Sequence, residues 1–138
     1  MTIRTRLRTL LAAHGTPLAA HAHCDLPCGV YDPAQARIEA QSVKAIMEKH
    51  NASSDEDFRM RANMIKEERC ELVKHHLWVL WTDYFKPEHL ATYANLHDLF
   101  WKATKSAGEA KKTNDVAVAD RLLEEIDGIA DIFWATKK

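Results

Sequence analysis

The sequence predicts an all-α protein, an antiparallel four-helix bundle preceded by a short N-terminal segment of different character. Apolar residues recur at helical spacing through four stretches of the 138-residue chain, and short polar breaks separate these stretches. No stretch alternates apolar and polar residues with the period of two that a half-buried strand requires. The chain has only four glycines, and its length predicts one domain with a core of its own.

The first helix is predicted to start after Asp32 and to reach about residue 50. Asp32 is a suitable N-cap, and Pro33 suits the first helical position because the missing N–H would have no partner there. The inward face is expected to carry Ala36, Ala40, Val43 and Met47.

The second helix is predicted to start at Ser54, which is followed by acidic residues that favour a helix N-terminus. It is predicted to end at Lys86, because the residue before a proline disfavours helix. Its inward stripe is expected to consist of Phe58, Ala62, Ile65, Leu72, Val73, Leu80 and Tyr84.

The third helix is predicted over residues 88–107, with Gly108 ending it, and the fourth is predicted to be capped by Asn114. The four tryptophans exceed the apolar surface that one small bundle can hide, which predicts self-association. Two adjacent histidines, His75 and His76, cannot share a helix face and are expected to be ordinary surface or packing residues.

The composition limits the possible partners and compartments. A formal net charge of -1 gives no electrostatic footprint for nucleic acid, and no apolar run reaches the length of a membrane span. Three cysteines, one of them the distant Cys70, make a poor disulfide framework, so reduced thiols are expected. We therefore expect a cytoplasmic protein, with export of the precursor as the alternative.

Residues 1–22 form a distinct leader. Three arginines and no acidic residue give them a charge of +3, which leaves -4 for the remainder of a chain whose total is -1. A secretory signal needs an unbroken apolar stretch, whereas here a histidine and a glycine interrupt a short one. We expect a removable pro-segment of another kind that a protease cleaves after Ala22, ahead of a hook at residues 23–32 and a bundle at residues 33–138.

The hook, His-Cys-Asp-Leu-Pro-Cys-Gly-Val-Tyr-Asp at residues 23–32, concentrates reactive groups. Its two thiols and imidazole suit a shared metal, and Pro27 and Gly29 are expected to turn the chain so that the sulfurs meet. The Cys-x3-Cys spacing by itself leaves open a zinc loop completed by a remote ligand, or a redox disulfide.

Cleavage after Ala22 would create a metal ligand that the uncleaved chain lacks, namely a free N-terminal amine. The free amine of His23 would lie one chelate ring from the amide nitrogen of Cys24. The His23 amine, the Cys24 amide nitrogen and the thiolates of Cys24 and Cys28 would form a planar N2S2 set. The His23 imidazole would sit above the plane. Planar coordination suits Ni(II) or Cu(II) rather than zinc, and such strong donors stabilise a higher oxidation state.

The hook resembles the nickel hook of the nickel-dependent superoxide dismutases. The similarity extends over essentially all of residues 23–138, through four further stretches at residues 33–40, 74–76, 80–87 and 132–138. The leader matches nothing closely.

The resemblance implies that the mature chain begins at His23 and that His23, Cys24 and Cys28 hold one nickel ion per subunit. It implies subunits that are four-helix bundles and that assemble into a homohexamer. The implied activity is antioxidant: disproportionation of superoxide to dioxygen and hydrogen peroxide through a Ni(III)/Ni(II) cycle.

The resemblance also implies roles for residues around the metal. Tyr31 would sit above its open face and order small molecules there, and Asp25 would help to hold the hook. Glu39 would accept a hydrogen bond from the axial imidazole, with Arg69 supporting it. Tyr84 and Lys86 would line the approach of superoxide.

Two other functions remain open at this point. One is a zinc-binding or regulatory module that uses Cys24, Cys28 and a histidine. The other is a non-catalytic helical scaffold whose hook is vestigial or still masked by the leader.

Overall fold

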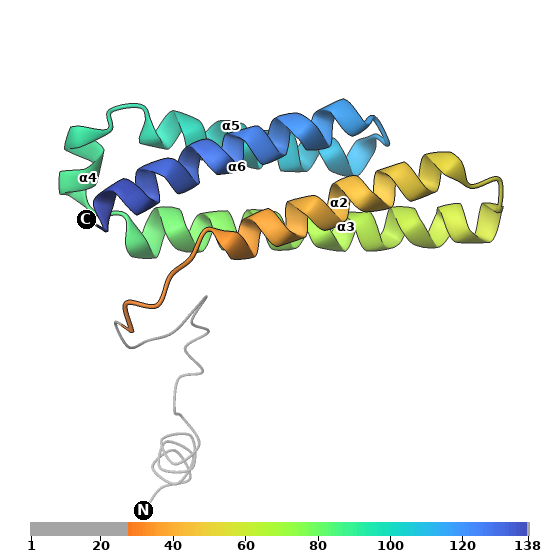
Figure 1. The fold of residues 1–138 in the computed structure, drawn as a ribbon, viewed down its shortest axis with the longest axis horizontal. Helices are drawn as coiled ribbons and strands as arrows, with labels where there is room; N and C mark the ends of the chain where they lie inside the picture. Colours follow the sequence, from red (N-terminus) through yellow and green to blue (C-terminus); the bar gives the residue numbers. More distant parts are fainter. Residues whose placement is uncertain (1–27, 138) are drawn as a thin grey trace, which may run out of the picture.

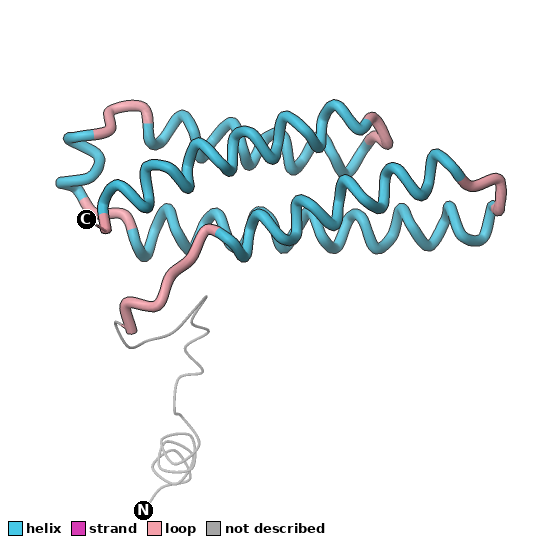
Figure 2. The backbone as a smooth tube through the Cα atoms, viewed as in Figure 1, coloured by secondary structure: helices cyan, strands magenta, loops and turns pink. Residues whose placement is uncertain are grey.

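Four long helices form the body of the protein in the computed structural model, which describes residues 28–137. They are α2 (Ala34–Ala52), α3 (Glu56–Val79), α5 (Leu96–Lys112) and α6 (Val116–Thr136) (Figure 1). Helix α2 packs on α3 and α6, and α5 packs on α3 and α6, so each helix has two neighbours. Figure 2 shows helices and loops alone over the described residues, which confirms the all-α bundle.

The bundle core consists of two clusters of buried hydrophobic side chains. The larger cluster of buried side chains draws on all four long helices, and it includes Ala40, Leu77, Phe100, Leu122, Ile126 and Phe133. A smaller cluster, toward the α2–α3 and α5–α6 turns, packs Cys70 among Val43, Met47, Ala110, Val118 and Ala119.

Helix α2 begins one residue later than predicted, because Pro33 rather than Asp32 is its N-cap, although the Asp32 side chain still contacts the helix start. The Asp32 carboxylate accepts a hydrogen bond from the Ala34 backbone N–H at 2.8 Å, which satisfies one of the first amides of the helix. The predicted inward residues Ala36, Ala40, Val43 and Met47 are all fully buried.

Helix α3 corrects two predictions. It is capped by Asp55 rather than Ser54, because the Asp55 carboxylate accepts from the N–H groups of Asp57 and Phe58 at 3.0 and 3.2 Å. Phe58 and Ile65 were predicted to point inward but are 42% and 40% exposed. The inward stripe instead runs through the charged Lys66, which is only 1% exposed.

The segment after α3 is more irregular than predicted. Helix α3 passes into a π-helical turn, η1 (Leu80–Tyr84), and a short helix, α4 (Pro87–Thr92), follows it. The predicted third helix is therefore divided, and α5 continues through Gly108 to Lys112. Packing explains this continuation, since Ala107 and Ala110 on either side of the glycine are fully buried and outweigh its low helix propensity.

The last helix is capped by Asp115 rather than by Asn114, which was predicted. The Asp115 carboxylate accepts from the Ala117 N–H at 3.0 Å, whereas the Asn114 side chain turns inward toward Lys66.

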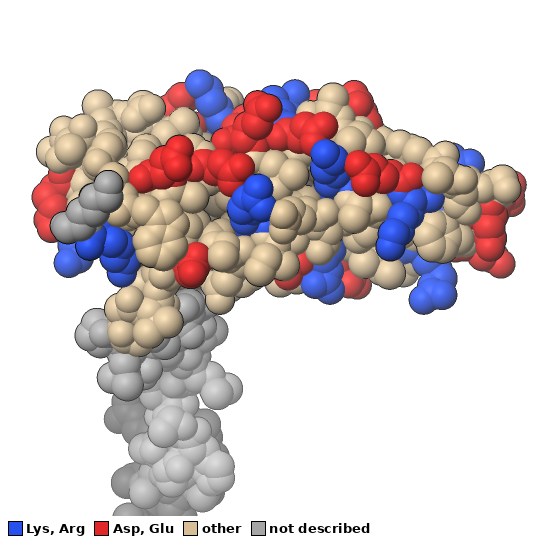
Figure 3. Space-filling model, in the orientation of Figure 1, with Lys and Arg blue, Asp and Glu red and all other residues tan. Residues whose placement is uncertain are grey.

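The surface of the described residues carries charge and exposed apolar side chains together. Figure 3 shows acidic and basic side chains interspersed along one face of the bundle. Three of the four tryptophans, Trp78, Trp101 and Trp134, are 43%, 60% and 50% exposed. No helix among the described residues is long and apolar enough to cross a membrane.

Candidate metal centre

The described part of the hook is an exposed turn that leads into α2. Cys28 is exposed, and the Val30 backbone N–H donates to its sulfur at 3.4 Å. Gly29 has a φ of +69°, a left-handed conformation that side chains with a Cβ atom rarely adopt. The glycine therefore forms part of the turn that the sequence predicted. His23, Cys24, Asp25 and Pro27 lie outside the described residues.

Cys28 is the predicted nickel ligand that the structure describes. Within residues 28–137 no group of three or more histidine, cysteine, aspartate or glutamate residues could hold a metal ion. The exposed thiol on a turn suits a soft, thiolate-binding metal.

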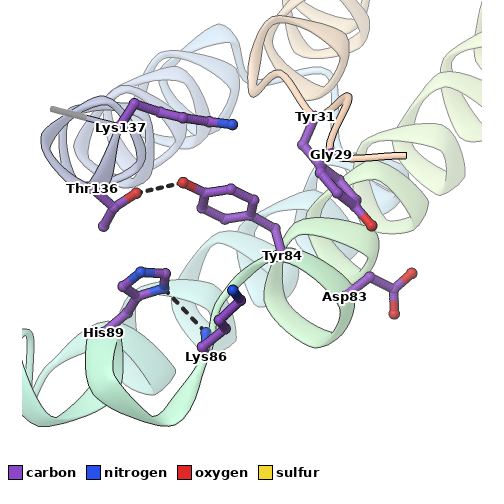
Figure 4. A pocket seen from close by; sticks show the side chains of 8 residues that line it. All are labelled: Gly29, Tyr31, Asp83, Tyr84, Lys86, His89, Thr136 and Lys137. Atoms are coloured by element: carbon purple, nitrogen blue, oxygen red, sulfur yellow. Dashed lines mark hydrogen bonds between the residues drawn. The ribbon is translucent and has the colours of Figure 1, made fainter. Parts of the chain in front are cut away.

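A cavity of about 420 Å³ opens beside this turn. We call it the hook-side cavity; Figure 4 shows side chains from the hook, from η1 and α4, and from the end of α6 converging on it. It brings together Tyr31, Tyr84 and Lys86, which the sequence analysis selected. Its full lining is Gly29, Tyr31, Asp83, Tyr84, Lys86, His89, Thr136 and Lys137.

Tyr84 is the side chain that joins this cavity to the core. Its ring lies 5.6 Å from that of Tyr31 and 4.4 Å from that of Phe133, measured between centroids. Its hydroxyl lies 2.6 Å from the hydroxyl of Thr136. The π-helical turn η1 supplies this placement, and such turns are frequent at functional sites.

The charges on the cavity are mostly positive. Lys86 and Lys137 both line it, opposed by Asp83. The Lys137 ammonium nitrogen lies 5.0 Å from the centroid of the Tyr84 ring, within range of a cation–π attraction. The backbone N–H of Lys86 donates to Nδ1 of His89 at 3.1 Å, which fixes the start of α4 at the cavity edge.

The two residues predicted to support the imidazole ligand meet each other. Nη1 of Arg69 on α3 lies 3.2 Å from Oε2 of Glu39 on α2. The Glu39 side chain is only 16% exposed, so it is the more protected partner. The predicted contact of Glu39 with the His23 imidazole falls outside the described residues.

Four cavity residues were not selected from the sequence: Asp83, His89, Thr136 and Lys137. Thr136 and Lys137 belong to the C-terminal stretch that resembles the family, which was the available signal. For His89 the signal was weaker, namely its position three residues after Lys86 at a helix start.

The remaining reactive side chains lie elsewhere. Cys70 is fully buried, and burial raises the pKa of its thiol to about 11, so it stays protonated. The rings of His75 and His76 are half-buried and pack edge to face at 5.4 Å.

Comparisons with known proteins agree with one another. The family model described as nickel-containing superoxide dismutase matches residues 18–137. The chain is 59% identical over 117 residues to superoxide dismutase [Ni] of Streptomyces seoulensis, covering 85% of this chain and 89% of that protein. It is 56% identical over the same length to the Streptomyces coelicolor protein of that name, with the same coverage.

Solved structures are similar as well. A native nickel superoxide dismutase structure has a TM-score of 0.82 and 55% identity, and the match covers 84% of this chain and 100% of that one. A nickel-containing superoxide dismutase structure with the nickel ligation of the oxidised state has a TM-score of 0.82 and 58% identity, over 83% and 98% of the two chains.

Proposed function

The chain belongs to the nickel-containing superoxide dismutase family, and from this premise we propose that its nickel site is the hook at residues 23–32. The protein is an oxidoreductase that converts superoxide to dioxygen and hydrogen peroxide, with nickel as cofactor. The comparisons give no support to the zinc-module alternative.

One observation carries the placement of the site. Cys28, an exposed thiol on a left-handed glycine turn, lies in the segment that borders the hook-side cavity with Tyr31, Tyr84 and Lys86. The buried Cys70 offers no comparable access, since its side chain is fully enclosed. A metal held by Cys28 would thus face a cavity that small molecules can enter.

The proposed ligands are the amine and imidazole of His23, the amide nitrogen and thiolate of Cys24, and the thiolate of Cys28. Amidate and thiolate donors suit planar nickel, which would supply a one-electron couple between two oxidation states when bound. Asp25 would help to hold the hook in place.

The surrounding residues would position and attract the reactants. Tyr31 would order small molecules at the cavity, and Lys86, with Lys137, would attract the superoxide anion. Tyr84 would form the wall opposite Tyr31. Glu39, held by Arg69, would accept a hydrogen bond from the His23 imidazole and fix its orientation.

Free access to the His23 amine requires removal of residues 1–22 by a protease that cleaves after Ala22. The match to the native structure supports a mature chain shorter than 138 residues, because it covers all of that chain but 84% of the present one. The leader, hook and bundle would then be residues 1–22, 23–32 and 33–138.

We further propose that the processed chain assembles into a homohexamer. The exposed apolar side chains support self-association, because a bundle with Met60, Met64 and Trp101 each about 60% exposed gains free energy by covering them. A cytoplasmic location would keep the thiol ligands reduced until the metal binds.

The experiment compares the 138-residue chain with one that begins at His23, after nickel loading, by mass spectrometry, metal analysis and superoxide dismutation. We expect one nickel per chain and full activity only for the shorter chain. Equal activity with the leader attached would contradict a role for the His23 amine. Zinc in place of nickel in the purified native protein would contradict the metal assignment.

A further inference from the structure

The last turn of α6 holds the hydroxyl of Tyr84. The Tyr84 oxygen lies 2.6 Å from Oγ1 of Thr136, and Figure 4 shows the two side chains pointing toward each other at the cavity wall. The Tyr84 ring is packed against Phe133 and stacked on His89, with centroids 4.4 and 5.9 Å away. The ring therefore has little freedom to turn its hydroxyl elsewhere.

A second hydrogen bond sets the direction of the first. Oγ1 of Thr136 donates to the backbone carbonyl of Phe133 at 2.6 Å. That carbonyl belongs to the final turn of α6, where carbonyl groups lack partners within the helix. A threonine hydroxyl has a single hydrogen. Because Thr136 uses it on Phe133, Thr136 accepts from Tyr84, and Tyr84 is the donor.

The direction of this bond changes what Tyr84 offers to the cavity. A phenol also has one hydrogen, so a Tyr84 hydroxyl that donates to Thr136 presents only lone pairs to other molecules. Lone pairs accept a hydrogen bond from an O–H group and repel an anion. The attraction for an anion in this cavity comes instead from the ammonium groups of Lys86 and Lys137.

We propose that Thr136 is a positioning residue that fixes Tyr84 as a hydrogen-bond acceptor toward the hook-side cavity. Tyr84 then selects a neutral molecule with an O–H group, water or the product hydrogen peroxide, and leaves the superoxide anion to the lysines. This selection of the product rests on the proposed function, whereas the direction of the Tyr84 hydrogen bond does not.

The test is an azide titration of the metal-free 138-residue chain carrying ¹³C at the tyrosine Cζ atoms. The three tyrosines give three signals, and Tyr84→Phe identifies the one that belongs to Tyr84. Thr136→Val keeps the side-chain shape but removes the acceptor, so the freed Tyr84 hydroxyl should donate to azide and its signal should shift saturably. The Tyr84 signal of the wild-type chain should shift much less, because azide attracted by Lys86 and Lys137 leaves the Tyr84 hydroxyl bonded to Thr136.

Thr136→Ser is the matched control, because it keeps the hydroxyl and loses only the methyl group. It should behave like the wild type. The proposal is overturned if wild-type Tyr84 responds to azide as Thr136→Val does, or if Thr136→Ser responds like Thr136→Val, which would assign the effect to methyl packing. Since no nickel is present, these results do not depend on dismutase activity.

The nickel-loaded enzyme gives a second readout. Azide inhibition of dismutation should become several-fold tighter in Thr136→Val and stay unchanged in Thr136→Ser, because only the first variant gains an anion-binding hydroxyl at Tyr84. Unchanged inhibition in both variants would contradict the proposed selection against anions, even with the dismutase activity intact.

Discussion

Cys28 and Cys70 occupy opposite surroundings. Cys28 is exposed on a turn and its sulfur accepts a backbone N–H, whereas Cys70 is fully enclosed in the bundle and holds its proton up to a pKa of about 11. Metals bind the thiolate rather than the thiol. The same residue type is therefore suited to chemistry at the hook and to packing inside the bundle.

At the same end of the bundle as Cys70, the buried polar side chain of Lys66 has its hydrogen-bond partners. The Lys66 amine donates to the Asn114 side-chain oxygen at 2.9 Å and to the Thr113 carbonyl, and Asn114 donates to Asn63 at 2.9 Å. These bonds tie α3 to the turn between α5 and α6. The charges at the hook-side cavity, in contrast, line a space that other molecules enter. The comparison predicts that changes near Cys70 alter stability and that changes at the cavity alter reactivity.

The largest effect on stability is expected from Lys66→Ala. It removes the buried stem and leaves the Thr113 carbonyl without its donor, so the free energy of unfolding should fall by about 2–4 kcal/mol. Lys66→Met refills the space and should recover part of the loss. Urea denaturation measures both variants. A loss of dismutase activity per folded chain in Lys66→Ala would contradict the expectation that changes near Cys70 alter stability and leave the reactivity of the hook-side cavity unchanged.

The second expected effect is on stability at high pH. Between pH 9 and 11 an unfolded chain loses the Cys70 proton near its ordinary pKa of 9.0, while the folded chain keeps it. Stability should therefore fall as pH rises through this window, by up to about 3 kcal/mol. Burial lowers the pKa of Lys66, which gives the opposite slope, so the informative quantity is the difference between wild type and Cys70→Ala.

Denaturation of wild type and Cys70→Ala at pH 8, 9, 10 and 11 measures this difference. The two free energies of unfolding should converge as pH rises, because the variant lacks the titrating thiol. If the free energies of unfolding of the two proteins run parallel with pH, Cys70 has the same pKa in the folded and unfolded chains. Its thiol would then be less enclosed than its burial indicates.

A smaller effect is expected from Lys86→Gln. Removing one cation from the cavity should lower kcat/KM for superoxide by about 10-fold at low salt and weaken its dependence on ionic strength. Stability should stay within about 0.5 kcal/mol, because Lys86 is exposed. Stopped-flow kinetics at several salt concentrations measure this effect, and Lys105→Gln is the control because it lies away from the cavity. If both variants match the wild type in rate and in salt dependence, the steering role of Lys86 is refuted.

A small stability effect is also expected from the Glu39–Arg69 pair. A partly exposed ion pair contributes about 0.2–1 kcal/mol, so Arg69→Met should change unfolding little. If Glu39 also orients the metal-bound imidazole, Glu39→Gln should change the electron paramagnetic resonance spectrum of the oxidised nickel enzyme. An unaltered spectrum would limit the pair to a link between α2 and α3.

Local patterns predicted most of the bundle. Apolar spacing located the long helices, and Asp32 located the start of α2. The burial of Lys66 was not predictable in this way, because a lysine in a helix is normally exposed and its partners Thr113 and Asn114 lie more than 40 residues away in the sequence. The apolar Phe58 and Ile65 were placed inside because of their hydrophobicity, but they are 42% and 40% exposed.

The metal-binding role of the hook, inferred from its donors and from its resemblance to a family, stays a prediction, and the cavity beside it was only partly predictable. Tyr31, Tyr84 and Lys86 were selected, whereas the hydrogen bond from Tyr84 to Thr136 spans 52 residues and depends on the π-helical turn at the end of α3. No rule of sequence spacing predicts a contact between the last turn of α6 and the π-helical turn that follows α3.

The nickel content of Cys28→Ser and Cys70→Ser, prepared side by side in the processed chain, tests the central claim most directly. The account predicts that Cys28→Ser loses bound nickel and dismutase activity while keeping its helical content, and that Cys70→Ser retains one nickel per chain. Retention of nickel by Cys28→Ser, or its loss from a folded Cys70→Ser, would contradict a metal site on the exposed hook.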